Sequence, residues 1–257
     1  MKLNSVAPKE SYTWIRQGIW LFKQNPLGFL MLVFMYVFAA QLAVIIPVIG
    51  VFAVLLLTPA LSVGFMTACR QGIQKERISP MVYLIALRSG ILIRKRILQL
   101  GLIYTVLVLA LSFVLSLLVD FETLLPLMTS DKPVTPEAIR QIYLVLFFGA
   151  ILYIPVAMLM WFSPILVAWA DMSIPQALFS SWLACWTNKA AFFFYLAIWS
   201  AILIAIPLSI GMVFDALDFG QAASFIIAPI SMAGLTVMHC SFYATWKACF
   251  TEDEVVI

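Results

Sequence analysis

The sequence is poor in charge and in the residues that build catalytic or metal centres. Only 11% of its 257 residues are Asp, Glu, Lys or Arg, whereas soluble domains average about 25%. It has one histidine, His239, and four scattered cysteines without the spacing of a metal site. A net charge of +3 is too small to indicate nucleic-acid binding. We therefore expect no metal, no cofactor and no nucleic acid.

Apolar residues are correspondingly abundant. They make up 64% of the chain, and the mean hydropathy is +1.07. A soluble fold of this size could not hide so much apolar surface, so most of the chain must be surrounded by lipid. The composition predicts an all-α membrane protein.

Six apolar stretches are each close to the roughly 20 residues that cross the hydrocarbon of a bilayer. They lie at about 27–46, 48–68, 97–119, 141–169, 190–213 and 222–245. Only Pro47 and Gly50 interrupt the first two, which predicts a tight hairpin. A re-entrant pair that does not cross the bilayer is the alternative for this hairpin.

The basic residues predict the orientation of the spans. If the N-terminus is cytoplasmic, 13 of the 15 Lys and Arg residues fall on the cytoplasmic side, and only Lys132 and Arg140 fall outside. Such an excess of basic residues is typical of cytoplasmic loops. The sequence therefore predicts an even number of spans with both termini in the cytoplasm.

A short segment recurs before the first, third and fifth stretches. Residues 16–19 (Arg-Gln-Gly-Ile) correspond to residues 88–91 (Arg-Ser-Gly-Ile), and a lysine follows each glycine by five residues. The sequence thus predicts three pseudo-repeats, each an interfacial amphipathic helix followed by a two-span hairpin, around an axis along the membrane normal. The single transmembrane domain 1–257 would divide into units 8–78, 79–172 and 173–250.

The interfacial segments carry apolar residues at helical spacing and basic residues toward their C-terminal ends. The apolar positions are Tyr12, Ile15, Ile19 and Phe22 in the first copy and Phe179, Trp182, Leu183 and Trp186 in the third. Ser173 and Gln176 have the spacing of a capping box. Helices of this kind lie in the headgroup region.

Basic residues of these segments are candidates for contacts with anionic lipid headgroups on the cytoplasmic face, and general anchoring is the alternative. The candidate headgroup contacts are Arg16, Lys23, Arg88, Arg94, Lys95, Arg96 and Lys189.

Two dipeptides place a proline inside a predicted span. Thr58-Pro59 and Ser163-Pro164 each remove a helical hydrogen bond, and the freed carbonyls could face a cavity. The alternative is a pair of kinks whose carbonyls are satisfied by the Thr and Ser hydroxyls or by neighbouring helices.

Charged residues are missing from the interior of the first five stretches. Ion-coupled transport usually needs an ionisable group within the membrane, and hydrolysis needs a nucleophile or an acid–base pair. Because neither is visible, we expect a protein that is not an enzyme, with His239 packed and hydrogen-bonded rather than catalytic.

Residues 18–26 (Gly-Ile-Trp-Leu-Phe-Lys-Gln-Asn-Pro), with paired spans that end near Thr58-Pro59, carry a family resemblance. The chain resembles six-span bacterial inner-membrane proteins that are similar to the membrane domain of glycerophosphodiester phosphodiesterases. The resemblance implies six spans in the cytoplasmic membrane and no established activity. The phosphodiesterase barrel is missing here, so its chemistry does not carry over.

The leading hypothesis is a non-enzymatic inner-membrane protein that binds lipid or another amphiphile, or that serves as an accessory subunit for a membrane-protein partner. The alternative is a facilitative transporter or channel for a small neutral or amphipathic solute. A carrier with three two-span repeats is excluded, because its amphipathic helix lies between the two spans and its Pro-x-acidic motif is missing here.

Overall fold

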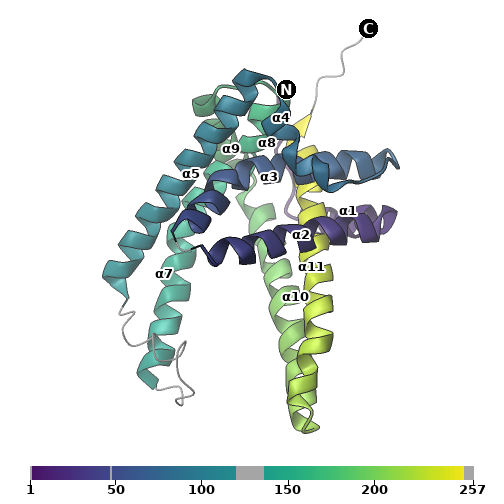
Figure 1. The fold of residues 1–257 in the computed structure, drawn as a ribbon, viewed down its shortest axis with the longest axis vertical. Coiled ribbons are helices and arrows are strands. Elements are labelled where there is room, and N and C mark those ends of the chain that lie inside the picture. Colours follow the sequence, from purple (N-terminus) through teal and green to yellow (C-terminus); the bar gives the residue numbers. More distant parts are fainter. Residues whose placement is uncertain (1, 47, 120–135, 252–257) are drawn as a thin grey trace.

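The computed structural model describes residues 2–46, 48–119 and 136–251, and helices account for nearly all of this part of the chain (Figure 1). In chain order the elements are β1 (Lys2–Leu3), α1 (Glu10–Gln24), α2 (Pro26–Val44), α3 (Ile49–Ile73), the 3₁₀ helix η1 (Pro80–Leu84), α4 (Ile85–Arg88), α5 (Ile91–Leu118), α7 (Pro136–Met160), α8 (Ser163–Trp169), α9 (Ile174–Thr187), α10 (Lys189–Ala216), α11 (Gly220–Cys249) and β2 (Phe250–Thr251).

Six helical segments among the described residues are long and apolar enough to cross a membrane. They are α2, α3, α5, α7 together with α8, α10 and α11, and they coincide with the six predicted stretches. The prediction of an all-α protein with six membrane-length helices is therefore confirmed. The threefold repeat stays a prediction.

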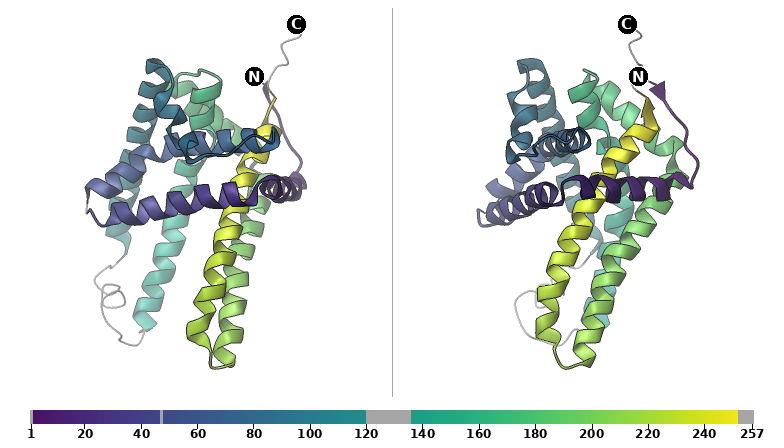
Figure 2. Two further views of the ribbon diagram at one scale, coloured as in Figure 1. Left: turned by 45° about the vertical axis from the view of Figure 1, so that its right-hand side comes forward. Right: turned by 90° about the vertical axis from the view of Figure 1, so that its right-hand side faces the viewer.

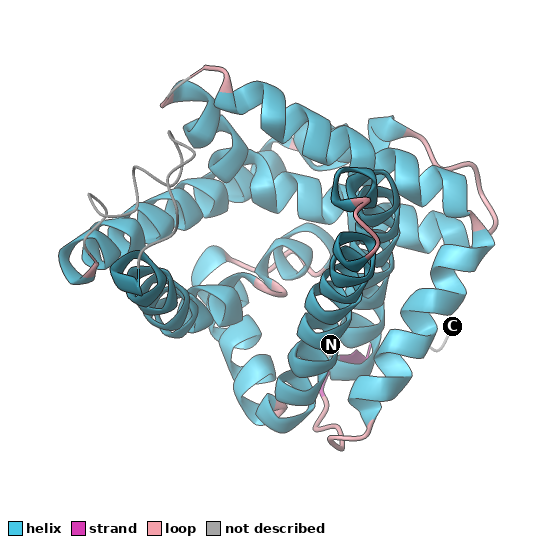
Figure 3. Cartoon of the chain, turned by 90° about the horizontal axis from the view of Figure 1, so that it is seen from below, coloured by secondary structure: helices cyan, strands magenta, loops and turns pink. Residues whose placement is uncertain are grey.

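These helices pack as three hairpins, α2 with α3, α5 with α7, and α10 with α11. The second and third hairpins extend away from the termini and diverge, whereas α2 lies across the direction of these hairpins (Figures 1 and 2). Seen from below, the long hairpins point toward the viewer in front of helices that lie across the view (Figure 3). The re-entrant alternative for the first hairpin requires α2 to lie across the other two hairpins in this way.

The two ends of the chain meet in a small antiparallel sheet. Lys2 pairs with Thr251 and Leu3 with Phe250. Asn188 ties this sheet to the start of α10, since its amide accepts from Val6 N at 2.8 Å and donates to the Asn4 carbonyl at 3.1 Å. The two strands therefore lie at the same end of the molecule.

Helix α2 begins where the sequence provides a cap. The side-chain oxygen of Asn25 accepts a hydrogen bond from Gly28 N at 3.0 Å, and Pro26 occupies the first turn, where its missing N–H costs nothing. The turn into α3 depends on Gly50, because a Cβ there would lie 1.7 Å from the Ala43 carbonyl oxygen. This explains the tight first hairpin.

Small residues let α3 approach its neighbours closely. Ala60 and Ala68 are buried, and a Cβ on Gly64 would lie 2.7 Å from Tyr83 Cα in η1. The small residues on this face of α3 therefore allow the backbone of η1 to pack closely on it. On the facing side, a Cβ on Gly101 of α5 would lie 2.0 Å from the Leu56 carbonyl oxygen.

The stretch 141–169 is not the single kinked helix that the sequence predicts. Helix α7 ends at Met160, and Ser163-Pro164 begins α8, so Pro164 occupies a first turn instead of a helix interior. Ser181 of α9 closes the break: its hydroxyl accepts from Phe162 N at 3.0 Å and donates to the Met158 carbonyl at 2.7 Å.

The second interfacial segment also differs from its prediction. It is not one amphipathic helix with basic residues at its end but two short pieces, η1 and α4. Arg94, Lys95 and Arg96 lie in the first turns of α5. A bend at Ser89-Gly90, where Ser89 is extended and Gly90 is not helical, separates them from Arg88.

The apolar face predicted for α9 points largely outward, since Phe179, Leu183 and Trp186 are exposed. The face predicted for α1 is divided: Tyr12 and Ile19 are exposed, whereas Ile15 is buried in the protein core and Phe22 is partly buried against it. An outward aromatic face is what a helix lying in the headgroup region presents to lipid.

Candidate functional site

A cavity of about 320 Å³ lies where the first hairpin meets the other two. Its walls come from α2, α3, η1, α5, α7 and α11, and its volume is within the range of small-molecule sites. We call it the tyrosine cavity. Its polar lining consists of Tyr36, Thr58, Ser62, Tyr83, Tyr104, Tyr153 and His239.

Two tyrosines from the second hairpin meet at the wall of the cavity. The hydroxyl oxygens of Tyr104 on α5 and Tyr153 on α7 are 3.3 Å apart, so one of them donates to the other. Tyr153 is 44% exposed. The pair therefore lies at the open mouth of the tyrosine cavity.

Tyr83 forms the wall on the η1 side. Its hydroxyl donates to the Leu32 carbonyl of α2 at 3.0 Å, and Gly64 allows η1 to lie against α3. Burial, followed by the nearby Tyr36, raises the pKa of the Tyr83 phenol well above its ordinary value. Tyr83 is therefore a neutral donor that joins η1 to the first hairpin.

His239 on α11 is held by one hydrogen bond and two aromatic rings. Its Nδ1 lies 2.8 Å from the Leu235 carbonyl oxygen. The rings of Phe65 and Phe242 lie 5.4 Å and 5.3 Å from the imidazole, centroid to centroid. The packed, hydrogen-bonded histidine expected from the sequence is what the structure contains, but the ring also lines the tyrosine cavity.

A second hollow, of about 240 Å³, adjoins the tyrosine cavity and shares Thr58, Ser62, Tyr104, Tyr153 and Phe242 with it. The two prolines singled out from the sequence, Pro59 and Pro164, line this hollow.

The hydroxyls beside these prolines bond to backbone carbonyls four residues earlier. Thr58 donates to the Val54 carbonyl of its own helix at 2.8 Å, and the fully buried Ser163, at the start of α8, donates to the Leu159 carbonyl of α7. Three of the four residues predicted at a kink or cavity, Thr58, Pro59 and Pro164, thus lie on the walls of a real cavity.

The predicted headgroup contacts are spread over the half of the molecule that holds the termini (Figure 1). Six of them are exposed: Arg16, Lys23, Arg88, Arg94, Lys95 and Lys189. Two of these lie against aromatic rings, with the Lys189 ammonium 4.9 Å from the Trp186 ring centroid and the Arg16 guanidinium 5.8 Å from that of Tyr12.

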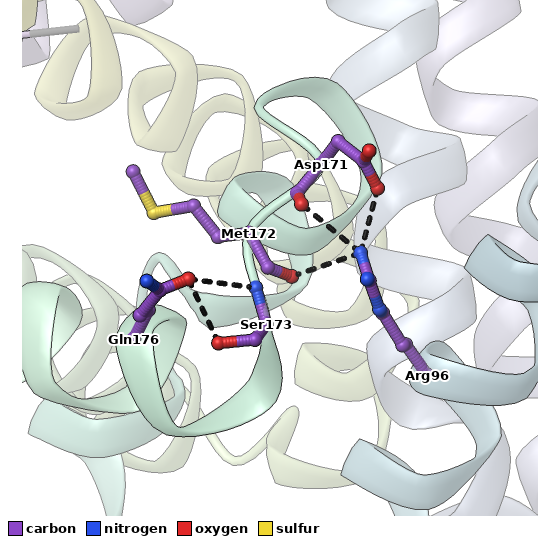
Figure 4. Close-up of polar contacts among 5 residues, drawn as sticks. All are labelled: Arg96, Asp171, Met172, Ser173 and Gln176. Atoms are coloured by element: carbon purple, nitrogen blue, oxygen red, sulfur yellow. Dashed lines mark hydrogen bonds and ion pairs between the residues drawn. The ribbon is translucent and has the colours of Figure 1, made fainter.

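Arg96, the seventh predicted headgroup contact, bonds to protein instead. Its guanidinium donates to the Asp171 carboxylate at 2.6 Å and to the Asp171 carbonyl at 3.0 Å (Figure 4). Beside it, the Gln176 side chain accepts from Ser173 N at 3.2 Å, in agreement with the predicted capping box. Arg96 therefore fixes the α8–α9 connection onto α5.

The sequence reasoning missed the tyrosines. Tyr36, Tyr104 and Tyr153 lie in three different membrane-length helices and have no common spacing. The available signal was the position of a phenol in the middle of an otherwise apolar helix, where its hydroxyl needs a partner. Among the described residues, no group of three or more His, Cys, Asp or Glu side chains could hold a metal ion.

A probable inner membrane protein of Burkholderia thailandensis is 39% identical to the chain over 259 residues, which cover 99% of this chain and 96% of the relative. The chain belongs to the family of that protein. No protein-family model matches the chain, and no solved structure matches it.

Membership of this inner-membrane family agrees with the six membrane-length helices. The name of the Burkholderia relative states no activity. The resemblance to the membrane domain of glycerophosphodiester phosphodiesterases stays a prediction.

Proposed function

We propose that this family member is a non-enzymatic inner-membrane protein that binds an amphiphile in the tyrosine cavity. The observation that carries the proposal is the mixed lining, in which hydroxyls and an imidazole face the same space as Phe65, Met66 and Phe242. A pocket with apolar walls and a few convergent polar groups is the usual form of a small-ligand site. An amphiphile from the bilayer would enter beside the exposed Tyr153.

A cavity-filling variant tests this proposal. Ser62→Trp places an indole in the space that both hollows share, and Ser200→Trp, on the exposed surface of α10, is the matched control. We expect lipid extracts of the purified wild-type protein and of Ser200→Trp to contain one retained amphiphile that Ser62→Trp lacks, with all three proteins monodisperse and equally helical. Equal retention by Ser62→Trp would refute the proposal.

The proposal includes an orientation in which the termini and the basic residues face the cytoplasm, next to anionic headgroups. The exposure of the basic residues supports this, as does an open hollow of about 440 Å³ in which Arg88 lies with Ser79 and Ser89. The Arg88 guanidinium suits a phosphate group, whereas the Ser89 hydroxyl already donates its proton to the Ile85 carbonyl at 2.8 Å. Reporter fusions that place the 70–96 segment outside the cell would refute the orientation.

A pseudo-threefold relation among the three units is also part of the proposal. Each interfacial segment packs on the second helix of the preceding hairpin, with η1 and α4 on α3, α9 on α7 and α8, and α1 on α11. The last of these contacts closes the ring, since it joins the first unit to the third. This cyclic pattern supports the repeat.

A facilitative transporter for a small neutral or amphipathic solute is the second candidate. It is favoured by the adjoining hollow, which extends the tyrosine cavity toward Pro59 and Pro164. Proteoliposomes should then accelerate the flux of a neutral solute, and Ser62→Trp should abolish the acceleration. A broad solute panel without any flux would leave only the binding function.

A further inference from the structure

Hydrogen bonds inside the protein already use several hydroxyl protons of the tyrosine cavity. The Tyr83 hydroxyl donates to the Leu32 carbonyl, and the Thr58 hydroxyl donates to the Val54 carbonyl. A hydroxyl has one proton and two acceptor lone pairs. Toward a ligand, Tyr83 and Thr58 therefore offer only acceptors.

His239 also uses its proton in a hydrogen bond inside the protein. A carbonyl oxygen can only accept, so the 2.8 Å contact with Leu235 means that Nδ1 carries the proton. At neutral pH an ordinary imidazole is mostly uncharged, which makes Nε2 an acceptor. The rings of Phe65 and Phe242 hold the imidazole in place on the cavity wall.

The tyrosine pair at the mouth can offer a ligand both a hydrogen-bond donor and hydrogen-bond acceptors. Whichever of Tyr104 and Tyr153 donates to the other, the acceptor of that bond keeps its own proton for a ligand. The hydroxyls of Tyr36 and Ser62 can each donate or accept a hydrogen bond. Three residues of the lining, Tyr83, Thr58 and His239, can therefore only accept hydrogen bonds from a ligand. The lining as a whole favours a ligand that carries hydrogen-bond donors.

The lining also contains no side chain that could neutralise an anion. Among the described residues around the tyrosine cavity, none is Lys or Arg. Carboxylate and phosphate bring acceptors and negative charge, which would meet the lone pairs of Tyr83, Thr58 and His239. Burying an unpaired charge among such groups is costly.

We infer that the tyrosine cavity selects an uncharged lipid with a hydroxyl headgroup, such as a diacylglycerol or a long-chain alcohol, over an anionic lipid of equal chain length. The inference rests on the proposed amphiphile-binding function. The ligand hydroxyl donates to His239 Nε2 and accepts from the free proton of the tyrosine pair, and its chains leave past Tyr153 toward the bilayer.

The test compares two probes with identical chains, dioctanoylglycerol and dioctanoyl phosphatidic acid, by native mass spectrometry of the full chain in nonionic detergent. Ser62→Trp separates cavity binding from binding to the basic exterior. We expect the cavity-dependent affinity of the wild-type protein to be at least tenfold higher for dioctanoylglycerol.

Substitutions at His239 test the acceptor directly. His239→Phe, which removes the acceptor, should weaken dioctanoylglycerol binding about tenfold, and His239→Gln, which keeps an acceptor oxygen, should retain most of it. Tyr143→Phe, at an exposed tyrosine of α7 outside the cavity lining, is the control and should bind like the wild-type protein.

The outcomes separate this inference from the proposed function. Cavity-dependent phosphatidic acid binding as tight as that of dioctanoylglycerol would overturn the hydroxyl selectivity and leave amphiphile binding standing. Wild-type affinity of His239→Phe for dioctanoylglycerol would overturn the role of the imidazole. If neither probe nor any native lipid bound in a Ser62-dependent way, the proposed function itself would fail.

Discussion

Replacing Gly101 by alanine should separate the first two hairpins and disturb the tyrosine cavity. A Cβ at this position would lie 2.0 Å from the Leu56 carbonyl oxygen and 2.9 Å from the Leu56 carbonyl carbon, both of which are backbone atoms. An ordinary carbon–oxygen contact needs about 3.4 Å. The backbones of α3 and α5 must therefore move apart by more than about 1 Å, because no flexible side chain can yield.

The loss of stability caused by Gly101→Ala can be estimated by comparison with Gly149→Ala. A Cβ on Gly149 would meet only Leu115 Cδ2, at 3.9 Å. Both substitutions gain about 1 kcal/mol of helix propensity, so this gain cancels in the comparison. Overpacking costs about 1–3 kcal/mol. We expect Gly101→Ala to be less stable than Gly149→Ala by that amount.

Unfolding by sodium dodecyl sulfate in mixed micelles, followed by circular dichroism, measures this difference. Gly101→Ala should also retain less of the copurifying amphiphile, because Tyr104 follows Gly101 by one helical turn and lines the tyrosine cavity. Equal stability of the two alanine variants would refute the close approach of α3 and α5.

Two further predictions concern the half of the molecule that holds the termini. Arg96→Leu should lower the free energy of unfolding by about 1 kcal/mol, because it removes a partly exposed ion pair with Asp171 and a bond to a carbonyl; Lys95→Leu is the control, and an equal effect of both would contradict this role. The triple variant Arg88→Gln, Arg94→Gln and Lys95→Gln should lose at least tenfold of the preference for phosphatidylglycerol over phosphatidylcholine in native mass spectrometry, since each basic group near the membrane contributes about 1 kcal/mol. An unchanged preference would mean that these residues do not contact headgroups.

The helices could be predicted because hydrophobicity and capping are local signals. The apolar runs gave six membrane-length helices, and the Ser173–Gln176 pair marked the start of α9. The break before Ser163 escaped prediction because Ser181, on another helix, supplies the hydrogen bonds that close it.

The tyrosine cavity could not be found in the same way. Tyr83 and Tyr104 are brought to one space by helix packing, and each sequence segment by itself gives no sign of the other. The prolines were more informative, because a proline within an apolar membrane-length stretch can be recognised from the local sequence alone. Pro59 and Pro164 do lie on the wall of the adjoining hollow.

An experimental structure of the protein in lipid nanodiscs, with a bound antibody fragment to aid alignment, would test amphiphile binding most directly. We predict elongated density in the tyrosine cavity, with one end within hydrogen-bonding distance of His239 and the Tyr104–Tyr153 pair and the other end continuing past Tyr153 into the bilayer. A cavity closed by side chains, with lipid density only on the outer faces of the helices, would contradict the proposal.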